Sequence, residues 1–258
     1  MQLFNFFILN SLITSFMKLD ILAFGAHPDD VELSCGGTLL MAKLSGKKTG
    51  VIDLTQGELG TRGSAPIRMQ EAAAAAKILQ LDIRENLGLA DGFFINDEHH
   101  QKLVIAAIRK YQPEIILCNA PEDRHPDHGK GAQLITDAAF LSGLKKIVTT
   151  NNGVEQEAWR PKYVFNYIQD VFIKPDFVMD ITASIDQKIE SIKAYKTQFY
   201  NPDHKETETY ISSPDFFESV IYRSKMLGKM IGVKYAEGFL SRKMIGFNNF
   251  DAFIKENT

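Results

Sequence analysis

Short apolar runs rich in β-forming residues alternate with longer helical stretches, and this order limits the folds available to the chain. The first half contains four predicted strands, at residues 19–25, 49–55, 84–89 and 114–120. Between and after them lie four predicted helices, at residues 36–45, 66–79, 98–111 and 129–142. Parallel strands need long crossover connections, which helices supply. The order therefore predicts an α/β protein with a mostly parallel sheet flanked by helices.

The second half of the chain continues the pattern less regularly. After Gly143, strands are predicted at residues 162–168 and 177–180, and helices at residues 185–199 and 214–231. The segment at residues 201–213 is polar, which is typical of a mobile loop or lid. No linker, repeat or low-complexity run interrupts residues 17–258, so we expect them to form a single domain.

The first residues of the chain differ in character from the rest. Residues 1–16 are apolar and aromatic, with no basic region and no small-residue cleavage site, and they are too short to span a bilayer. Met17 stands directly before the first predicted strand. We therefore expect residues 1–16 to be a non-native or disordered extension and not a targeting segment.

The composition excludes several classes of protein. The chain has 258 residues, of which 45% are hydrophobic and 24% charged, as in an ordinary globular protein. A net charge of −3 offers no basic surface for nucleic acid, and no segment predicts a membrane span. Two cysteines, Cys35 and Cys118, are too few for a disulfide framework, which favours the reducing cytoplasm.

Two clusters of histidine and aspartate follow predicted strands. His27-Pro28-Asp29-Asp30 comes after the first strand, and His125-Pro126-Asp127-His128 after residues 114–120. Ligands of open α/β sheets bind beyond the carboxyl ends of the strands. Imidazole and carboxylate groups suit Zn²⁺, and three protein ligands leave a position for water. We therefore predict His27, Asp30 and His128 as metal ligands, with Fe²⁺ as an alternative to Zn²⁺; the competing interpretation is that Asp30 and His128 only begin helices.

The remaining polar residues of the two clusters are candidates for proton transfer. Asp29 lies next to a predicted ligand without needing to bind the metal itself, which suits a general base. Asp127 could orient His125 and favour its protonated form, and a cationic His125 would stabilise an oxyanion. The alternatives are a solvated aspartate and a surface His-Asp pair.

A glycine-rich segment at residues 56–63 follows the second predicted strand. Its glycines suggest a close approach of the backbone to a ligand, but it matches neither a phosphate-binding loop nor a dinucleotide fingerprint. Arg62 within it, and Arg68 at the start of the next helix, are candidates to hold an anionic group of a substrate. We rank Arg68 first; the alternative for each is a solvated surface arginine.

The clusters resemble the two signatures of the PIG-L/LmbE-type zinc N-acetylglucosaminyl deacetylases. The matching runs are GAHPDDVE at residues 25–32, with Gly36-Gly37-Thr38, and EDRHPDH at residues 122–128. The resemblance extends from Met17 to about Lys243 and includes YAEGF at residues 235–239. Within the family, the run GELGTRG at residues 57–63 is most similar to the bacillithiol biosynthesis deacetylase.

This resemblance implies a Rossmann-like fold and a single Zn²⁺ bound by His27, Asp30 and His128. It also implies Asp29 as general base, His125 as oxyanion stabiliser oriented by Asp127, and Arg68 as a substrate-binding residue. A tyrosine that some members place near the active site falls at Phe216 here.

The implied reaction is hydrolysis of the acetamide of an N-acetylglucosamine conjugate, with N-acetylglucosaminyl malate as the narrower expectation and a homo-oligomer as the assembly. The same chemistry on another acetylated amino sugar or thiol conjugate is the alternative. A non-catalytic metal-binding or sugar-binding module would not need Asp29 and His125. A nucleotide-binding Rossmann protein would need a glycine fingerprint that the sequence lacks.

Overall fold

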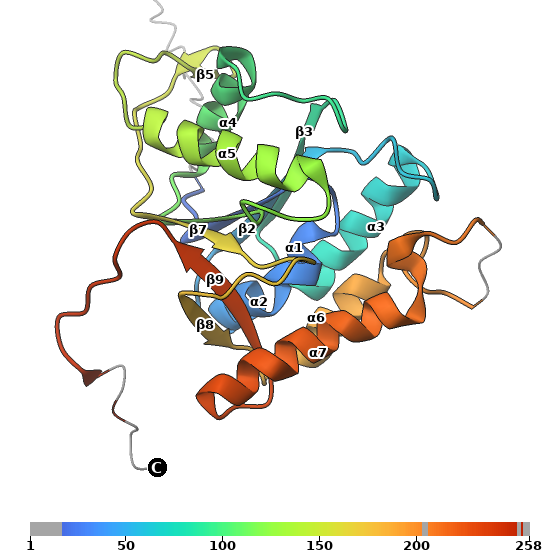
Figure 1. Ribbon diagram of the computed structural model, residues 1–258. Helices are drawn as coiled ribbons and strands as arrows, with labels where there is room; N and C mark the ends of the chain where they lie inside the picture. Colours follow the sequence, from blue (N-terminus) through green and yellow to red (C-terminus); the bar gives the residue numbers. More distant parts are fainter. Residues whose placement is uncertain (1–16, 203–205, 252–253, 255–258) are drawn as a thin grey trace, which may run out of the picture.

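Figure 1 shows the computed structural model, which describes residues 17–202, 206–251 and 254. The expectation for residues 1–16 lies outside the described residues. A central sheet has the strand order β3-β2-β1-β4-β7-β9-β8. β1, β2, β3, β4 and β7 run parallel, whereas β9 is antiparallel to both β7 and β8. The predicted α/β fold with a mostly parallel sheet flanked by helices is confirmed.

The strands and helices follow one another in the predicted order. The strands of the sheet are β1 Ile21–Gly25, β2 Thr49–Thr55, β3 Ile83–Leu89, β4 Ile115–Cys118, β7 Tyr163–Tyr167, β8 Phe177–Asp180 and β9 Ala236–Ser241, and a separate hairpin holds β5 Thr150–Asn151 and β6 Val154–Glu155. The helices are α1 Asp30–Ser34, α2 Gly36–Leu44, α3 Ala65–Ile78, α4 Glu98–Tyr111, α5 Pro126–Leu141, α6 Ile185–Lys193 and α7 Pro214–Ile231, with a 3-10 turn at Tyr210–Ser212. Among the described residues, no helix is both long and apolar enough to cross a membrane.

Helices cover both faces of the sheet because the buried strands carry apolar side chains on both sides. Leu22 and Phe24 of β1 pack in one core with residues of α4 and α5. Ala23, between them, points to the other face and packs with Val31 of α1 and Leu39 of α2. This alternation follows from the two-residue period of a strand. In Figure 1, α4 and α5 lie on one side of the sheet and α1, α2, α3 and α6 on the other.

Several element boundaries differ from the prediction, and two of the differences affect the site. Helix α5 begins at Pro126 and not at residue 129, because proline is well suited to the first turn of a helix. The short helix α1 starts at Asp30, a helix start that the sequence suggested only in the competing interpretation of that residue. Helix α6 ends at Lys193, before the predicted end at residue 199.

Strand β9 was not predicted as a strand, and it ties the end of the chain to the first half of the sheet. Glu237 accepts hydrogen bonds from the backbone N–H of Gly37 at 3.0 Å and of Thr38 at 2.7 Å. These are free donors at the start of α2, where a negative charge is favoured. Lys188 of α6 forms a buried ion pair with Glu237 at 2.5 Å. The carboxylate therefore joins β9, α2 and α6.

Replacing Phe239 of β9 by alanine should destabilise the protein. Phe239 is 1% exposed and stacks on Phe177 with ring centroids 5.3 Å apart. Loss of a buried phenylalanine ring costs about 3–5 kcal/mol. Urea unfolding should show a clearly lower midpoint for Phe239→Ala and almost none of this effect for Phe93→Ala, whose side chain is 76% exposed. Equal midpoints for the two variants would contradict the packing of β9.

Candidate active site

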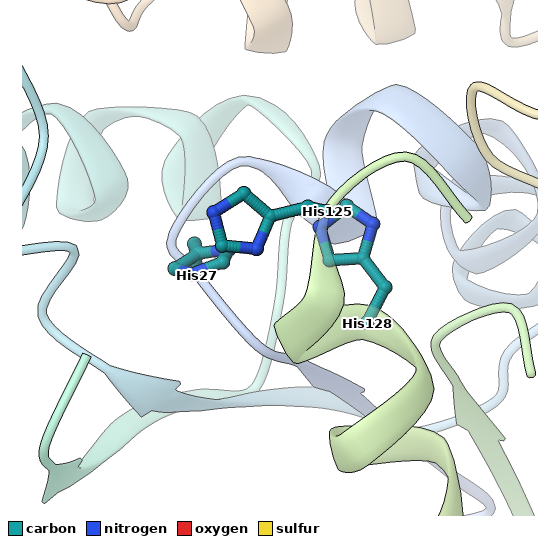
Figure 2. Close-up of side chains that lie close together, drawn as sticks. All are labelled: His27, His125 and His128. Atoms are coloured by element: carbon teal, nitrogen blue, oxygen red, sulfur yellow. The ribbon is translucent and has the colours of Figure 1, made fainter. Parts of the chain in front are cut away.

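The two predicted clusters meet because their strands are neighbours. β1 and β4 are paired in parallel, so the loops that follow them leave the same edge of the sheet. Asp29 has a left-handed backbone, with φ at 115°, and this turn leads directly into α1. His125 is the N-cap of α5 and His128 lies in its first turn. Figure 2 shows His27, on the loop after β1, facing His125 and His128.

Asp30 is the contact point between the clusters. Its Oδ2 accepts hydrogen bonds from His27 N and from Asn119 Nδ2, each at 2.9 Å. Its Oδ1 lies 3.1 Å from His128 Nε2 and accepts from Gln169 Nε2 at 3.2 Å. Burial alone would raise the pKa of Asp30, but the neighbouring His128 and His27 outweigh it and hold the pKa well below its usual range. The carboxylate is therefore ionised and fixed in place.

In each of the two predicted ligand histidines, one ring nitrogen faces Asp30. The second ring nitrogen faces a different carboxylate. His27 Nδ1 lies 3.7 Å from Asp30 Oδ2, and His27 Nε2 lies 3.0 Å from Asp91 Oδ1. His128 Nδ1 lies 2.6 Å from Asp123 Oδ2. Metal-binding histidines commonly donate their second ring N–H to a carboxylate, which orients the ring. Asp91 and Asp123 lie where they can orient His27 and His128 in this way.

Asp91 and Asp123 were not predicted from the sequence. Asp123 lies within the EDRHPDH run, two residues before the first histidine of that run. This closeness in sequence to the histidines was the only indication that Asp123 belongs to the site. Asp91 follows the end of β3 by two residues, and strand ends at this edge of the sheet carry the site. The sequence offered no indication that its side chain would reach His27.

The charges around the histidines suit a cation. Burial would lower the pKa of His27, but Asp127 and Asp91 outweigh it and raise that pKa to about 9. The pKa of His128 likewise rises to about 10, because Asp30 and Asp123 outweigh the effect of burial. The negative charge that binds these protons would also hold a divalent metal ion in their place.

Two groups of the described residues have ligand atoms close enough to share a metal ion. One is His27, His125 and His128, and the other is His27, Asp91 and Asp127, with all atoms of each group within 4.8 Å of one another. The first group lines a cavity together with Asp30. Asp127 is fully buried and does not line that cavity. A metal ion held by the first group would face the cavity, and this group contains His125 where the predicted ligand set has Asp30.

Asp29 and Arg68 form a buried ion pair at the cavity wall. Arg68 Nη2 lies 2.6 Å from Asp29 Oδ2, and the guanidinium also donates to the carbonyl of Pro28 from Nε at 3.1 Å and from Nη2 at 2.9 Å. Arg68 passes so close to Gly57 that a Cβ there would lie 2.2 Å from Nη1. Burial raises the pKa of Asp29 to about 7, although Arg68 opposes the rise. Such a carboxylate can exchange a proton near neutral pH.

The expected contact between the Asp127 carboxylate and His125 is not the one found in the structure. The carboxylate of Asp127 accepts from Gly92 N at 2.7 Å and from Lys130 Nζ at 3.0 Å, and it lies 3.5 Å from His27 Nε2. The backbone N–H of Asp127 instead donates to His125 Nδ1 at 3.3 Å. This bond exists because His125 is the N-cap of α5, a position that the predicted helix start had excluded.

This hydrogen bond favours the neutral form of His125. An Nδ1 that accepts a hydrogen bond carries no proton, so the proton of a neutral ring lies on Nε2. Burial lowers the pKa of His125, and the neighbouring His27 and His128 lower it further. The cationic form that the sequence suggested is therefore disfavoured, while the Nε2–H stays available as a donor.

The cavity beside these groups has a volume of about 330 Å³ and reaches from the histidines to α7. Its wall contains both predicted substrate-binding arginines, Arg62 and Arg68. Phe216 lines it as well, and the nearby Tyr210 supplies a hydroxyl that donates to Asp170 Oδ1 at 3.2 Å. The predicted loop at residues 201–213 thus contributes to the cavity through its described residues.

Comparisons with known proteins find similarity to de-N-acetylases. A family model described as PIG-L, GlcNAc-PI de-N-acetylase, matches residues 22–139. The chain is 25% identical over 228 residues to the diacetylchitobiose deacetylase of Thermococcus kodakarensis, covering 84% of this chain and 81% of that protein. It is 24% identical over 199 residues to a Bacillus subtilis protein named Probable N-acetyl-alpha-D-glucosaminyl L-malate deacetylase 2, covering 70% of this chain and 84% of that protein.

A solved structure is similar over nearly the whole fold. The crystal structure of the conserved protein TT1542 from Thermus thermophilus superposes with a TM-score of 0.79 at 35% identity, covering 89% of this chain and 97% of that chain. The matched region of the family model contains both histidine clusters, and this structural match extends beyond that region.

Removing Asp91 or Asp123 should weaken metal binding without removing a ligand. Loss of a carboxylate that orients a ligand histidine typically costs 10–100-fold in metal affinity, so we expect a loss of about that size for Asp91→Asn and for Asp123→Asn. The measurement is a competition titration of metal-free protein with Zn²⁺ and a chromophoric chelator. The control is Asp137→Asn, which removes a carboxylate on α5 that contacts neither His27 nor His128. Unchanged affinity in both test variants would contradict the assigned role.

Proposed function

The chain belongs to the PIG-L family, and we propose that it is a metal-dependent N-deacetylase that releases acetate from an N-acetylglucosamine conjugate. One observation carries the proposal. A predicted metal-binding set, His27, Asp30 and His128, shares a cavity with two groups suited to proton transfer and charge stabilisation, Asp29 and His125. A site that only bound a metal or a sugar would not need these two groups.

The donor set suits a divalent cation held by His27, Asp30 and His128, with Asp91 and Asp123 orienting the two histidines. When bound, Zn²⁺ or Fe²⁺ would polarise the acetamide carbonyl and lower the pKa of a water molecule. Both metals fit imidazole and carboxylate ligands, so we assign the site to a divalent metal with Zn²⁺ as the first choice.

Asp29 is the proposed general base. Its pKa of about 7 allows it to take a proton from the attacking water and to return one to the departing amine. The ion pair with Arg68 fixes the position of the carboxylate. Most of the Arg68 donors are used by Asp29 and by the carbonyl of Pro28, so we propose that Arg68 acts mainly by orienting the base.

His125 is the proposed donor to the oxyanion. Its neutral ring keeps a proton on Nε2, and it lies within the histidine cluster with its ring centroid 4.5 Å from that of His27. A hydrogen bond from a preorganised donor to a developing negative charge stabilises the transition state more than the substrate. Asp127 supports this group through its backbone N–H.

For the substrate, we propose N-acetylglucosaminyl malate. The support is the GELGTRG run at residues 57–63 and the similarity to the Bacillus subtilis protein named for that substrate. The similarity to a diacetylchitobiose deacetylase favours a second candidate, an acetylated chitosugar, with the same chemistry. The cytoplasmic location and the homo-oligomer expected from the sequence stay predictions.

Acetate release tests the proposal directly. Protein stripped with a chelator should release no acetate from N-acetylglucosaminyl malate, and addition of Zn²⁺ or Fe²⁺ should restore release. Diacetylchitobiose and plain N-acetylglucosamine are the comparison substrates. Acetate release that is unaffected by removal of the metal would exclude the proposed chemistry.

Replacing the base should separate catalysis from metal binding. We expect Asp29→Asn to lower kcat by about 10²–10⁴-fold, because general base catalysis contributes an amount of this order. The Zn²⁺ affinity should stay close to that of the unmodified protein, since Asp29 is not a proposed ligand. Asp186→Asn, an exposed position on α6, is the matched control. A near-normal kcat for Asp29→Asn would refute its role.

A further inference from the structure

The four arginines that line the cavity differ in their partners. They are Arg62, Arg68, Arg124 and Arg223. Arg68 forms an ion pair with Asp29, and Arg124 forms one with Asp170 at 3.1 Å. Among the residues that the structure describes, Arg62 and Arg223 form no ion pair with a carboxylate. Within this part of the chain, two of the four arginines at the cavity wall thus have no carboxylate in direct contact.

Arg62 is the more deeply buried of the two. Its exposed fraction is 6%, and its Nε is buried with no hydrogen-bond partner in the described part of the chain. The backbone is held in place, because the Arg62 carbonyl accepts from Gln198 Nε2 at 3.0 Å. A buried donor on a charged group destabilises the protein unless a partner satisfies it. Since Arg62 also lines the cavity, its guanidinium group can meet a ligand there.

Arg223 reaches the same cavity from α7. Its guanidinium donates to the backbone carbonyls of Gln169 and, at 3.4 Å, of Leu33. These neutral partners orient the side chain, and neither of them is a counterion. Burial lowers the pKa of Arg223, although the more distant Asp170 and Asp123 oppose this effect.

The position of Arg223 connects it with the proposed metal site. The side chain of Gln169 donates to Asp30 Oδ1, while the backbone carbonyl of the same residue accepts from Arg223. A substrate that places its acetamide beside the histidines can therefore extend toward α7 within one cavity.

We propose that Arg62 and Arg223 bind an anionic group, a carboxylate or a phosphate, on the part of the substrate that is linked to the amino sugar. This inference rests on the proposed deacetylase function and narrows its substrates to acidic conjugates. Guanidinium groups match the planar oxygen pairs of carboxylates and phosphates and bind them through charge-assisted hydrogen bonds. A neutral amino sugar would supply neither arginine with a counterion.

Three substrates with the same sugar test the inference. N-acetylglucosaminyl malate carries carboxylates, N-acetylglucosamine 1-phosphate carries a phosphate, and methyl N-acetylglucosaminide is neutral. The measured quantity is the ratio of kcat/KM for each acidic substrate to that for the neutral one. We expect the better acidic substrate to exceed the neutral one by roughly 10–100-fold, as charge-assisted hydrogen bonds allow. The better acidic substrate identifies the anion.

The variants Arg62→Gln and Arg223→Gln should each lower this ratio by about 10-fold, mainly through a higher KM for the acidic substrate. Arg160→Gln removes the same charge from an exposed arginine that does not line the cavity and is the control. Arg223→Lys keeps a positive charge but loses the paired N–H donors of a guanidinium, so it should lower the ratio less than Arg223→Gln. Free malate and inorganic phosphate should inhibit the unmodified protein more strongly than Arg62→Gln.

The outcomes separate the two proposals. Equal kcat/KM values for acidic and neutral substrates, or ratios that do not change in Arg62→Gln, would overturn the anion site and leave the deacetylase function standing. No acetate from any of the three substrates with metal supplied would overturn the deacetylase function itself.

Discussion

The buried carboxylate of Asp30 is the interaction on which the rest of the site depends. It accepts hydrogen bonds from the loop after β1, through His27 N, and from the end of β4, through Asn119. It also faces His128 on α5. A buried ionised carboxylate needs such partners, because desolvation without them is costly. Asp30 thereby fixes the relative positions of two histidine clusters that are far apart in the sequence.

Two further carboxylates give the histidines their orientation. Asp91 contacts Nε2 of His27, and Asp123 contacts Nδ1 of His128. The other ring nitrogen of each histidine therefore faces Asp30. Asp29 precedes the predicted ligand Asp30 in the sequence, and Asp127 precedes the predicted ligand His128. Their surroundings differ, because Asp29 is paired with Arg68 and Asp127 with Lys130. The environment, and not the residue type, decides which aspartate can act as a base.

The sequence was sufficient to predict most strands of the sheet, most helices and the two histidine clusters that meet at its edge. Strand β2, helix α4 and helix α7 have their predicted bounds, because apolar patterning and terminal signals agree there. The contact of the Asp127 carboxylate could not be predicted, because it depends on α5 beginning at Pro126. The contact between Asp91 and His27 depends on tertiary packing, on which local sequence carries no information.

The position of a bound metal ion is the most direct test of the proposed site. Crystals of the protein loaded with Zn²⁺ would give an anomalous difference peak at the zinc absorption edge. We expect one peak bounded by His27 Nδ1, the Asp30 carboxylate and His128 Nε2, with Asp91 still at His27 Nε2 and Asp123 still at His128 Nδ1. A peak on the other side of the His27 ring, between Asp91 and Asp127, would contradict it.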